Sequence, residues 1–260
     1  MVLAPVAAML LAAGRGERMR PLTDSCPKPL LLVRGKPLMQ WHLEALARGG
    51  FNHVVVNTAW LGEQIERSIS SSLQIQYSHE GRDFGGALET AGGIVRALPL
   101  LCPTEHTDAG ADVFWVLAAD VFVPGFKFTQ AAVDRFKCSG KLAHLWLVSN
   151  PAHNVAGDFG LGLNAGAVPG ELSRVGLALN LPPADARPRY TYSTIGLYRK
   201  ALFEPPWCSI PSGNPQGMKA PLAPLLRAAM DNALVTAELY DGAWTDVGTP
   251  ERLEVLNALK

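Results

Sequence analysis

Residues 7–23 read AAMLLAAGRGERMRPLT, and this stretch decides the fold of the chain. Ala7–Ala12 is uninterrupted apolar sequence, which predicts a strand buried on both faces of a parallel sheet. The run passes directly into Gly14-Arg15-Gly16, a glycine-rich turn. A glycine turn after a buried strand offers backbone N–H groups to an anion, because glycine tolerates the required dihedrals and does not block approach.

Outward from this turn, strand-like and helix-like segments alternate along the chain. We expect further strands at His53–Ala59, Leu73–Tyr77, Asp112–Ala119, Ala143–Ser149, Tyr190–Tyr198 and Ala237–Asp246. We expect helices at Leu38–Arg48, Leu61–Ser70, Thr90–Leu98, Phe128–Phe136, Ala220–Asp231 and Pro250–Leu259. This order predicts right-handed βαβ units and an α/β fold, Rossmann-like and doubly wound, with a mostly parallel sheet. Phe159–Val168 and Leu177–Pro188 are expected to form hairpins or loops at one end of the sheet.

The composition limits the class of protein. The chain has 260 residues, 48% of them hydrophobic and 18% charged, which excludes a disordered protein and supports one domain over residues 1–260. Its 23 basic and 23 acidic residues cancel, which argues against nucleic-acid and membrane-surface partners. The apolar N-terminal run follows no Lys or Arg, and no later run reaches the ~18 apolar residues of a membrane span. We therefore expect a cytoplasmic protein.

The glycine turn is dense in cations, because Arg15, Arg18, Arg20 and Lys28 follow closely on one another. The residues alone leave a solvated basic loop as the alternative to a phosphate site. Met19 stands where the dinucleotide-binding fingerprint has its third glycine, and no Gly-Lys-Ser/Thr follows. This disfavours a Rossmann oxidoreductase and excludes a P-loop. Lys28 lies between two prolines, which restrict the backbone around it and suit a rigidly presented ammonium group.

These features together resemble a known family. The run Leu11–Thr23, followed by Pro27-Lys28-Pro29, resembles the signature of sugar-1-phosphate nucleotidyltransferases. Within that family, further motifs are similar to those of uridylyltransferases that act on N-acetylmuramate 1-phosphate in cell-wall recycling: Asn57–Gly62, Leu88–Ile94, Gly157–Phe159, Lys219–Arg227 and Trp244–Thr249. The resemblance covers almost the whole chain. It implies a glycosyltransferase-A-like fold with a small antiparallel sugar-binding insertion.

The resemblance also implies which residues form the site. The nucleotide would contact a set drawn from three motifs: Leu11, Ala13, Gly14, Gly16, Glu17, Arg18, Lys28, Thr90 and Gly92. The sugar phosphate would contact Asn150, Asp158, Ser193 and Lys219. Arg18 and Lys28 would be the catalytic pair. The residues themselves leave alternatives open, since Thr90 is equally a helix cap and Asp158 a turn residue.

Two distant aspartates, Asp120 and Asp246, each end a predicted strand. Mg²⁺ prefers hard oxygen ligands, usually one or two carboxylates together with substrate phosphates. Each aspartate alone is equally a cap or turn residue. The family holds Mg²⁺ with an Asp at each of these motifs, so the resemblance implies this cofactor. The nearest relatives tend to have Asn-Gly-Asp where this chain has Ala118-Ala119-Asp120, so the identity of the sugar stays open.

The resemblance implies an enzyme that transfers a uridylyl group from UTP to a sugar 1-phosphate, N-acetylmuramate 1-phosphate above all, and releases pyrophosphate. The sugar phosphate is already ionised at about pH 7, so no general base is required. Other pairs stay open: mannose 1-phosphate with GTP, or glucose 1-phosphate with dTTP or UTP. A regulatory module that binds a nucleotide sugar without turnover is the alternative from another class. The chain ends soon after Asp246, without the family's C-terminal β-helix, so we expect a monomer.

Overall fold

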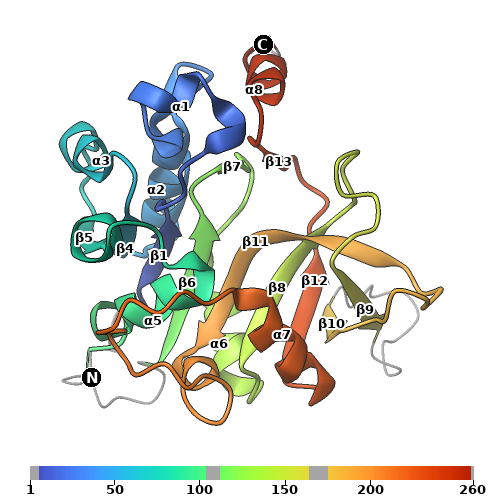
Figure 1. The fold of residues 1–260 in the computed structure, drawn as a ribbon. Helices are drawn as coiled ribbons and strands as arrows, with labels where there is room; N and C mark the ends of the chain where they lie inside the picture. Colours follow the sequence, from blue (N-terminus) through green and yellow to red (C-terminus); the bar gives the residue numbers. More distant parts are fainter. Residues whose placement is uncertain (1–5, 104–111, 164–174, 259–260) are drawn as a thin grey trace.

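A computed structural model of the chain describes residues 6–103, 112–163 and 175–258 (Figure 1). Its centre is a nine-stranded sheet in the order β5-β4-β1-β6-β11-β8-β12-β10-β9. The strands are β1 (Ala8–Leu11), β4 (His53–Thr58), β5 (Gln74–His79), β6 (Val113–Ala118), β8 (Ala143–Val148), β9 (Phe159–Leu163), β10 (Val175–Leu179), β11 (Arg189–Arg199) and β12 (Val235–Leu239). The prediction of a doubly wound α/β fold is confirmed.

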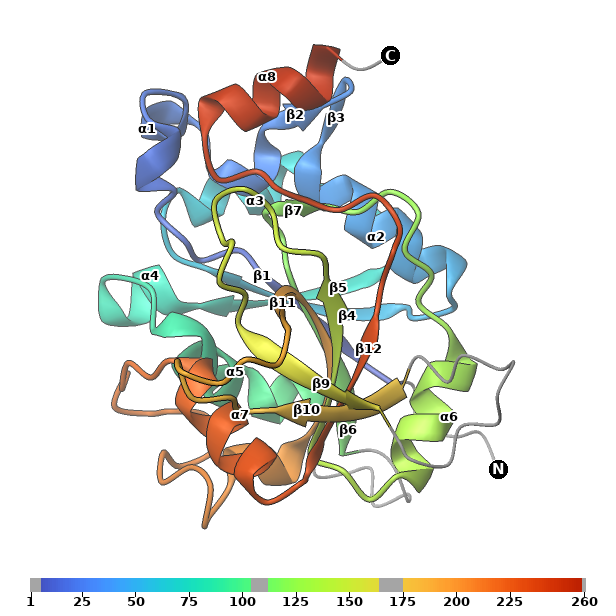
Figure 2. The same ribbon diagram turned by 90° about the vertical axis from the view of Figure 1, so that its right-hand side faces the viewer.

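Helices cover both faces of this sheet (Figure 2). The helices α2 (Leu38–Arg48), α3 (Gly62–Ser68) and α6 (Gln130–Cys138) pack on one face. The helices α5 (Glu89–Leu101) and α7 (Leu222–Asp231) pack on the other face. Side chains alternate along β1. Those of Ala8 and Leu10 pack in the core under α2, α3 and α6, and that of Met9 packs in the core under α5 and α7. Burial on both faces explains why the strand reads as continuous apolar sequence.

The two halves of the sheet differ in how their strands pair, because the first half is entirely parallel and the second half is mixed. Strands β5, β4, β1 and β6 run parallel to one another, so their carboxyl ends meet at one edge. The long strand β11 runs antiparallel to β6, to β8 and to β9. The hairpin expected from the glycine-rich second half is the β9–β10 pair, which extends the large sheet. Residues 164–168 of that predicted segment lie outside the described residues.

Helix α5 continues through Pro99, whereas the sequence predicts an end before this residue. A proline within a helix lacks the N–H that would bond the carbonyl four residues earlier. That carbonyl belongs to Val95, and it accepts a hydrogen bond of 2.9 Å from the N–H of Gly213 instead. A distant loop thus satisfies the group that Pro99 leaves free. The predicted cap is also wrong, because Thr90 lies inside the first turn of the helix and no side chain caps it.

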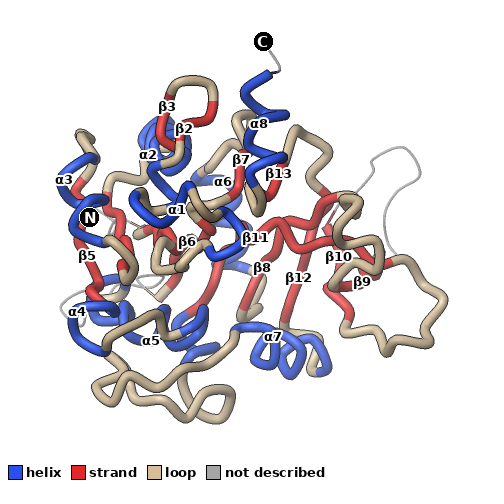
Figure 3. Tube along the Cα trace, turned by 45° about the horizontal axis from the view of Figure 1, so that its top comes forward, coloured by secondary structure: helices blue, strands red, loops and turns tan. Residues whose placement is uncertain are grey.

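The strand predicted at Ala237–Asp246 is in fact two strands. The first, β12, ends at Leu239 and pairs with β8 and β10 in the large sheet. The second, β13 (Thr245–Asp246), pairs with β7 (Val121–Phe122), as Figure 3 shows beside α8 (Pro250–Ala258). The chain changes partners between them, so the intervening residues cannot remain in one ladder. This break carries Asp246 to the segment that follows β6.

Short elements complete the fold. They are α1 (Leu22–Ser25), α4 (Glu80–Phe84) and the hairpin of β2 (Leu32–Val33) and β3 (Lys36–Pro37). None of the helices in the described part of the chain is both long and apolar enough to span a bilayer.

Candidate active site

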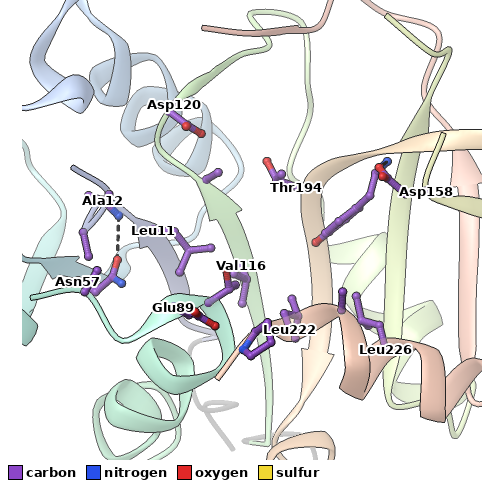
Figure 4. Close-up of a pocket in the computed structure, with 18 of the residues that line it drawn as sticks. Leu11, Ala12, Asn57, Glu89, Val116, Asp120, Asp158, Thr194, Leu222 and Leu226 are labelled. Carbon is purple, nitrogen blue, oxygen red and sulfur yellow. Dashed lines mark hydrogen bonds between the residues drawn. The ribbon is translucent and has the colours of Figure 1, made fainter. Parts of the chain in front are cut away.

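A cavity of about 650 Å³ opens at the carboxyl ends of the parallel strands. Two walls enclose it (Figure 4). We call one the parallel wall, which consists of Leu11–Gly14, Lys28, Pro29, Asn57, Glu80, Ala87, Glu89, Thr90, Val116, Ala118 and Asp120. We call the other the antiparallel wall, which consists of Asp158, Phe159, Tyr192, Thr194, Pro221, Leu222, Ala223, Leu226 and Arg227. Ligands of open α/β sheets bind at this edge, so the cavity is the candidate active site.

The glycine turn, Gly14-Arg15-Gly16, contributes Gly14 to the parallel wall. Gly16 has a φ of 68°, and a side chain there would meet the methyl group of Thr23 at 3.0 Å. The Thr23 hydroxyl donates to the Gly16 carbonyl at 2.7 Å, which closes the turn. Gly14 is exposed, and a Cβ added there would meet nothing within 4 Å. Gly16 therefore shapes the turn, whereas Gly14 presents open backbone to the cavity.

Lys28 supplies a buried cation to this wall. Its residue is only 7% exposed, and it begins a short 3₁₀ turn between Pro27 and Pro29. The Nζ atom lies 2.6 Å from Oδ2 of Asp120, the residue that follows β6. The predicted Lys28 and Asp120 are therefore brought together in one cavity, although they are distant in sequence. A charged pair at this distance is held by a charge-assisted hydrogen bond.

Asp246 approaches the same region through its backbone. It pairs with Val121 in the β13–β7 ladder, and the next residue's N–H donates to the Asp120 carbonyl at 3.0 Å. Its carboxylate contacts Arg252 at 2.7 Å and His153 at 3.4 Å, and it does not line the cavity. Among the described residues, no cluster of three or more His, Cys, Asp or Glu side chains could hold a metal.

The donor set nevertheless fits a magnesium ion. Asp246 of β13 pairs with Val121, and Asp120 is the turn residue just before Val121, so the two carboxylates come from adjacent segments. Mg²⁺ usually takes only one or two carboxylates, with phosphates and water completing its shell. Both carboxylates also have cationic partners, Lys28 and Arg252, that a divalent ion would compete with.

The three arginines of the glycine turn differ in their contacts. Arg15 lies over the Trp60 ring, with its guanidinium carbon 3.5 Å from the ring centroid. Arg20 pairs with Asp24 at 3.1 Å. Arg18 is exposed, stands outside the cavity lining, and contacts no partner in the part of the chain that the structure describes. Glu17 beside it is exposed as well.

The antiparallel wall carries Asp158, as expected for the sugar side. Its Oδ2 accepts a hydrogen bond from the Tyr192 N–H at 2.8 Å, and its Oδ1 accepts from the Asn154 amide at 3.2 Å. Thr194 lies in a bulge of β11 with a φ of 67°, an unusual conformation for a β-branched residue. Figure 4 shows Thr194 across the cavity from Asp120.

Four other predicted residues lie outside the cavity lining. Ser193 is buried and donates to the Trp146 carbonyl at 2.7 Å, which holds the bulge. The Asn150 amide donates to the carbonyls of Val155 and Arg189, so it fastens a loop.

Gly92 belongs to the packing of α5, because a Cβ there would lie 2.5 Å from the Met218 carbonyl. Lys219 lies in the segment that packs against Gly92, between Met218 and Ala220. Lys219 is exposed and has no partner within the described ranges.

The lining also includes residues that sequence reasoning did not assign to the site, among them Asn57, Glu80 and Arg227. Asn57 stands in a motif that carries the family resemblance, and Glu80 directly follows β5, so strand ends gave a usable signal for both. Arg227 lies on the exposed side of α7 and contacts no partner among the residues the structure describes. Only the topology brings it to the cavity.

Comparison with known proteins agrees with this geometry. Residues 7–161, more than half of the chain, match the family model described as Nucleotidyl transferase. The chain is 42% identical to the N-acetylmuramate alpha-1-phosphate uridylyltransferase of Neisseria meningitidis serogroup B, over 97% of each protein. It is 31% identical to the UTP--glucose-1-phosphate uridylyltransferase of Synechocystis, over 93% of this chain and 60% of that protein. A crystal structure of a Bacillus anthracis protein assigned as a glucose-1-phosphate thymidylyltransferase shares the fold, with a TM-score of 0.66, 18% identity and coverage of 97% and 94% of the two chains.

Proposed function

Since this chain belongs to the nucleotidyl transferase family, we propose that it transfers a uridylyl group from UTP to a sugar 1-phosphate. The observation that carries the proposal is the buried ammonium of Lys28, which is held beside Asp120. It lines the same cavity as the open backbone of Gly14. A fixed cation with free N–H groups is suited to a triphosphate, because it stabilises negative charge without reorganising during the reaction.

The chemistry needs alignment more than proton transfer. An oxygen of the sugar phosphate forms a bond to the α-phosphorus of UTP, and the bond from that phosphorus to the bridging oxygen of pyrophosphate breaks. We assign Lys28 to the charge that develops at the reacting phosphates, and Arg18, which is exposed at the turn, to the outer phosphates. The backbone from Leu11 to Gly14 would hold the nucleotide in line.

We further propose that Asp120 and Asp246 hold Mg²⁺ when the nucleotide is bound. Asp246 lies on β13 and Asp120 lies in the turn just before β7, the strand that pairs with β13, and both offer the oxygen donors that this ion prefers. A bound magnesium ion supplies positive charge to the triphosphate and to the leaving pyrophosphate. Lys28, which contacts the Asp120 carboxylate from a buried position, would share that carboxylate with the ion and offer its other N–H groups to phosphate oxygens.

Among sugars, an acidic one is favoured by Arg227. This guanidinium belongs to the antiparallel wall, with Asp158 and Phe159, and has no anionic partner in the described part of the chain. N-acetylmuramate carries a carboxylate that an arginine can bind with two parallel hydrogen bonds, whereas glucose and mannose do not. We therefore propose N-acetylmuramate 1-phosphate as the acceptor.

A substrate panel tests the proposed function. Pyrophosphate release would be followed for UTP, GTP and dTTP, each with N-acetylmuramate, glucose and mannose 1-phosphates. We expect the highest kcat/KM for UTP with N-acetylmuramate 1-phosphate. Binding of UTP without pyrophosphate release from any pair would contradict an enzymatic role and favour a regulatory binding module.

A further inference from the structure

The parallel wall contains a buried carboxylate that the mechanism does not use. Glu80 is 0% exposed and begins α4, directly after β5. Its Oε1 accepts a hydrogen bond from the Asn57 amide at 2.6 Å, and its Oε2 accepts one from the Leu88 N–H at 2.7 Å. Burial raises the pKa of this carboxyl group, and both hydrogen bonds oppose that shift, together with the positive charge of Arg96. Each oxygen is therefore engaged within the protein.

The hydrogen bonds continue from Asn57 to the glycine turn. Its Oδ1 accepts a hydrogen bond from the Ala12 N–H at 2.8 Å, which Figure 4 marks. A single relay thus runs from Ala12 through Asn57 and Glu80 to Leu88. It links the end of β1 to the loop that enters α5.

The relay leaves particular N–H groups open to the cavity. The N–H groups of Ala12 and Leu88 are engaged by the relay. The next residues along the chain are Ala13 and Gly14 on one side, and Glu89 and Thr90 on the other, and all four line the cavity. No partner for their N–H groups occurs among the described residues. The relay therefore fixes the spacing between two sets of open donors.

Close packing leaves the relay little room to relax. A Cβ added at Gly93 of α5 would lie 2.5 Å from Oε1 of Glu80 and 3.0 Å from the Asn57 amide nitrogen. The carboxylate consequently rests directly on the helix backbone. Buried hydrogen-bonded networks of this kind favour one arrangement, because an unpaired member is costly in a medium of low dielectric.

We infer that Glu80 and Asn57 are a positioning pair: they set the distance between the glycine turn and the start of α5, and thereby the affinity for the nucleoside triphosphate. This inference rests on the proposed function, since a triphosphate and its base would span the two segments. Both side chains are almost fully buried, at 3% and 0% exposure, so the pair would act on the nucleotide through backbone donors. Its loss should weaken nucleotide binding without altering the binding of the sugar phosphate.

An exchange of the two side-chain types offers a sharp test. In Glu80→Gln, the new amide faces the amide of Asn57, so one hydrogen bond of the relay is lost. In the double variant Asn57→Asp/Glu80→Gln, the new carboxylate accepts from Ala12 and from the new amide, whose carbonyl accepts from Leu88. All three hydrogen bonds are then restored. Glu238→Gln is the control, since Glu238 accepts from the Trp146 indole N–H away from the cavity.

The readouts are the Kd of UTP by titration calorimetry, the KM of each substrate, and the melting temperature. We expect Glu80→Gln to raise the Kd and KM of UTP by about tenfold, and the double variant to return within about threefold of wild type. The KM of the sugar phosphate should stay within about twofold in every variant. Glu238→Gln should leave the UTP affinity unchanged, even where it lowers the melting temperature.

Two results would overturn the inference. One is wild-type UTP affinity in Glu80→Gln, and the other is an exchange variant that binds UTP as weakly as Glu80→Gln. If UTP binding depends on Glu80 but no sugar phosphate is turned over, the proposed function fails and the positioning pair stands. If turnover is normal and affinity ignores Glu80, the pair fails and the function stands.

Discussion

The two walls of the cavity present their positive charge in opposite ways. On the parallel wall, Lys28 is buried between two prolines and held by Asp120 at 2.6 Å. On the antiparallel wall, Arg227 is exposed on α7 without a partner among the described residues. A fixed charge suits a group that every substrate shares, whereas a free charge suits a group that differs between substrates. Under the proposed function, this difference assigns the chemistry to one wall and the choice of sugar to the other.

The largest expected effect concerns the fixed charge. Lys28→Ala removes the buried ammonium that stabilises the reacting phosphates, so we expect kcat to fall by about 10³-fold. Asp120 is partly exposed and can be solvated after this change, so the fold should persist. Pyrophosphate release and a melting curve measure the two properties. Activity near that of wild type in this variant would remove Lys28 from the mechanism.

The next effect concerns the proposed metal ligand on the same wall. Asp120→Asn should lower activity by about 10²-fold and weaken its dependence on added Mg²⁺, because the amide is a poorer ligand than a carboxylate. Asp112→Asn is a matched control, since Asp112 precedes the same strand at its other end and pairs with Arg199 at 2.8 Å. Titration of Mg²⁺ against initial rate provides the measurement. An unchanged magnesium dependence in Asp120→Asn would argue against this site.

A smaller and selective effect is expected on the antiparallel wall. Arg227→Ala should lower kcat/KM for N-acetylmuramate 1-phosphate by about tenfold, through loss of one contact with the sugar carboxylate. The kcat/KM for glucose 1-phosphate should change by less than about twofold, because that sugar has no carboxylate. Parallel kinetics on both sugars make the comparison. An equal loss with both sugars would mean that the division of labour between the walls is wrong.

The last effect concerns folding stability rather than activity. His42 is buried and lies 2.7 Å from the Val121 carbonyl, and burial lowers its pKa to about 4. The unfolded chain, with a His pKa near 6.5, binds more protons between these values, so folding stability falls as the pH falls through this window. From about pH 7 to about pH 5, the wild type should lose about 2 kcal/mol more than His42→Gln. Urea unfolding at both pH values measures this difference, and equal losses would contradict it.

Local sequence was sufficient for much of the parallel half. Helix α2 has the predicted bounds, Leu38–Arg48, because its apolar spacing and the following Gly49 are both local signals. Gly14 and Lys28 were likewise predicted from one local motif and both line the cavity, whereas the predicted Arg18 lies outside its lining. These features need no knowledge of distant partners.

Long-range partners account for what the sequence did not reveal. The division of β12 from β13 depends on β7 and β8, which lie far away in the chain. The continuation of α5 past Pro99 depends on Gly213. The packing of α7 against the sheet brings Arg227 to the cavity, whereas the position of Glu80 directly after β5 was a local signal that sequence reasoning did not use. The roles assigned to the site residues remain predictions for the experiments above.

Strand β11 is hydrogen-bonded to β6 beside one wall and to β9 within the other. The strand passes from one wall to the other through the bulge at Thr194, and the hydrogen bond from Ser193 to the Trp146 carbonyl holds this bulge, so the folded sheet sets the width of the cleft. A rigid inhibitor that spans both walls would then pay little reorganisation cost on binding. For the same reason, acceptance of a bulkier sugar should require smaller side chains at the rim rather than a domain movement.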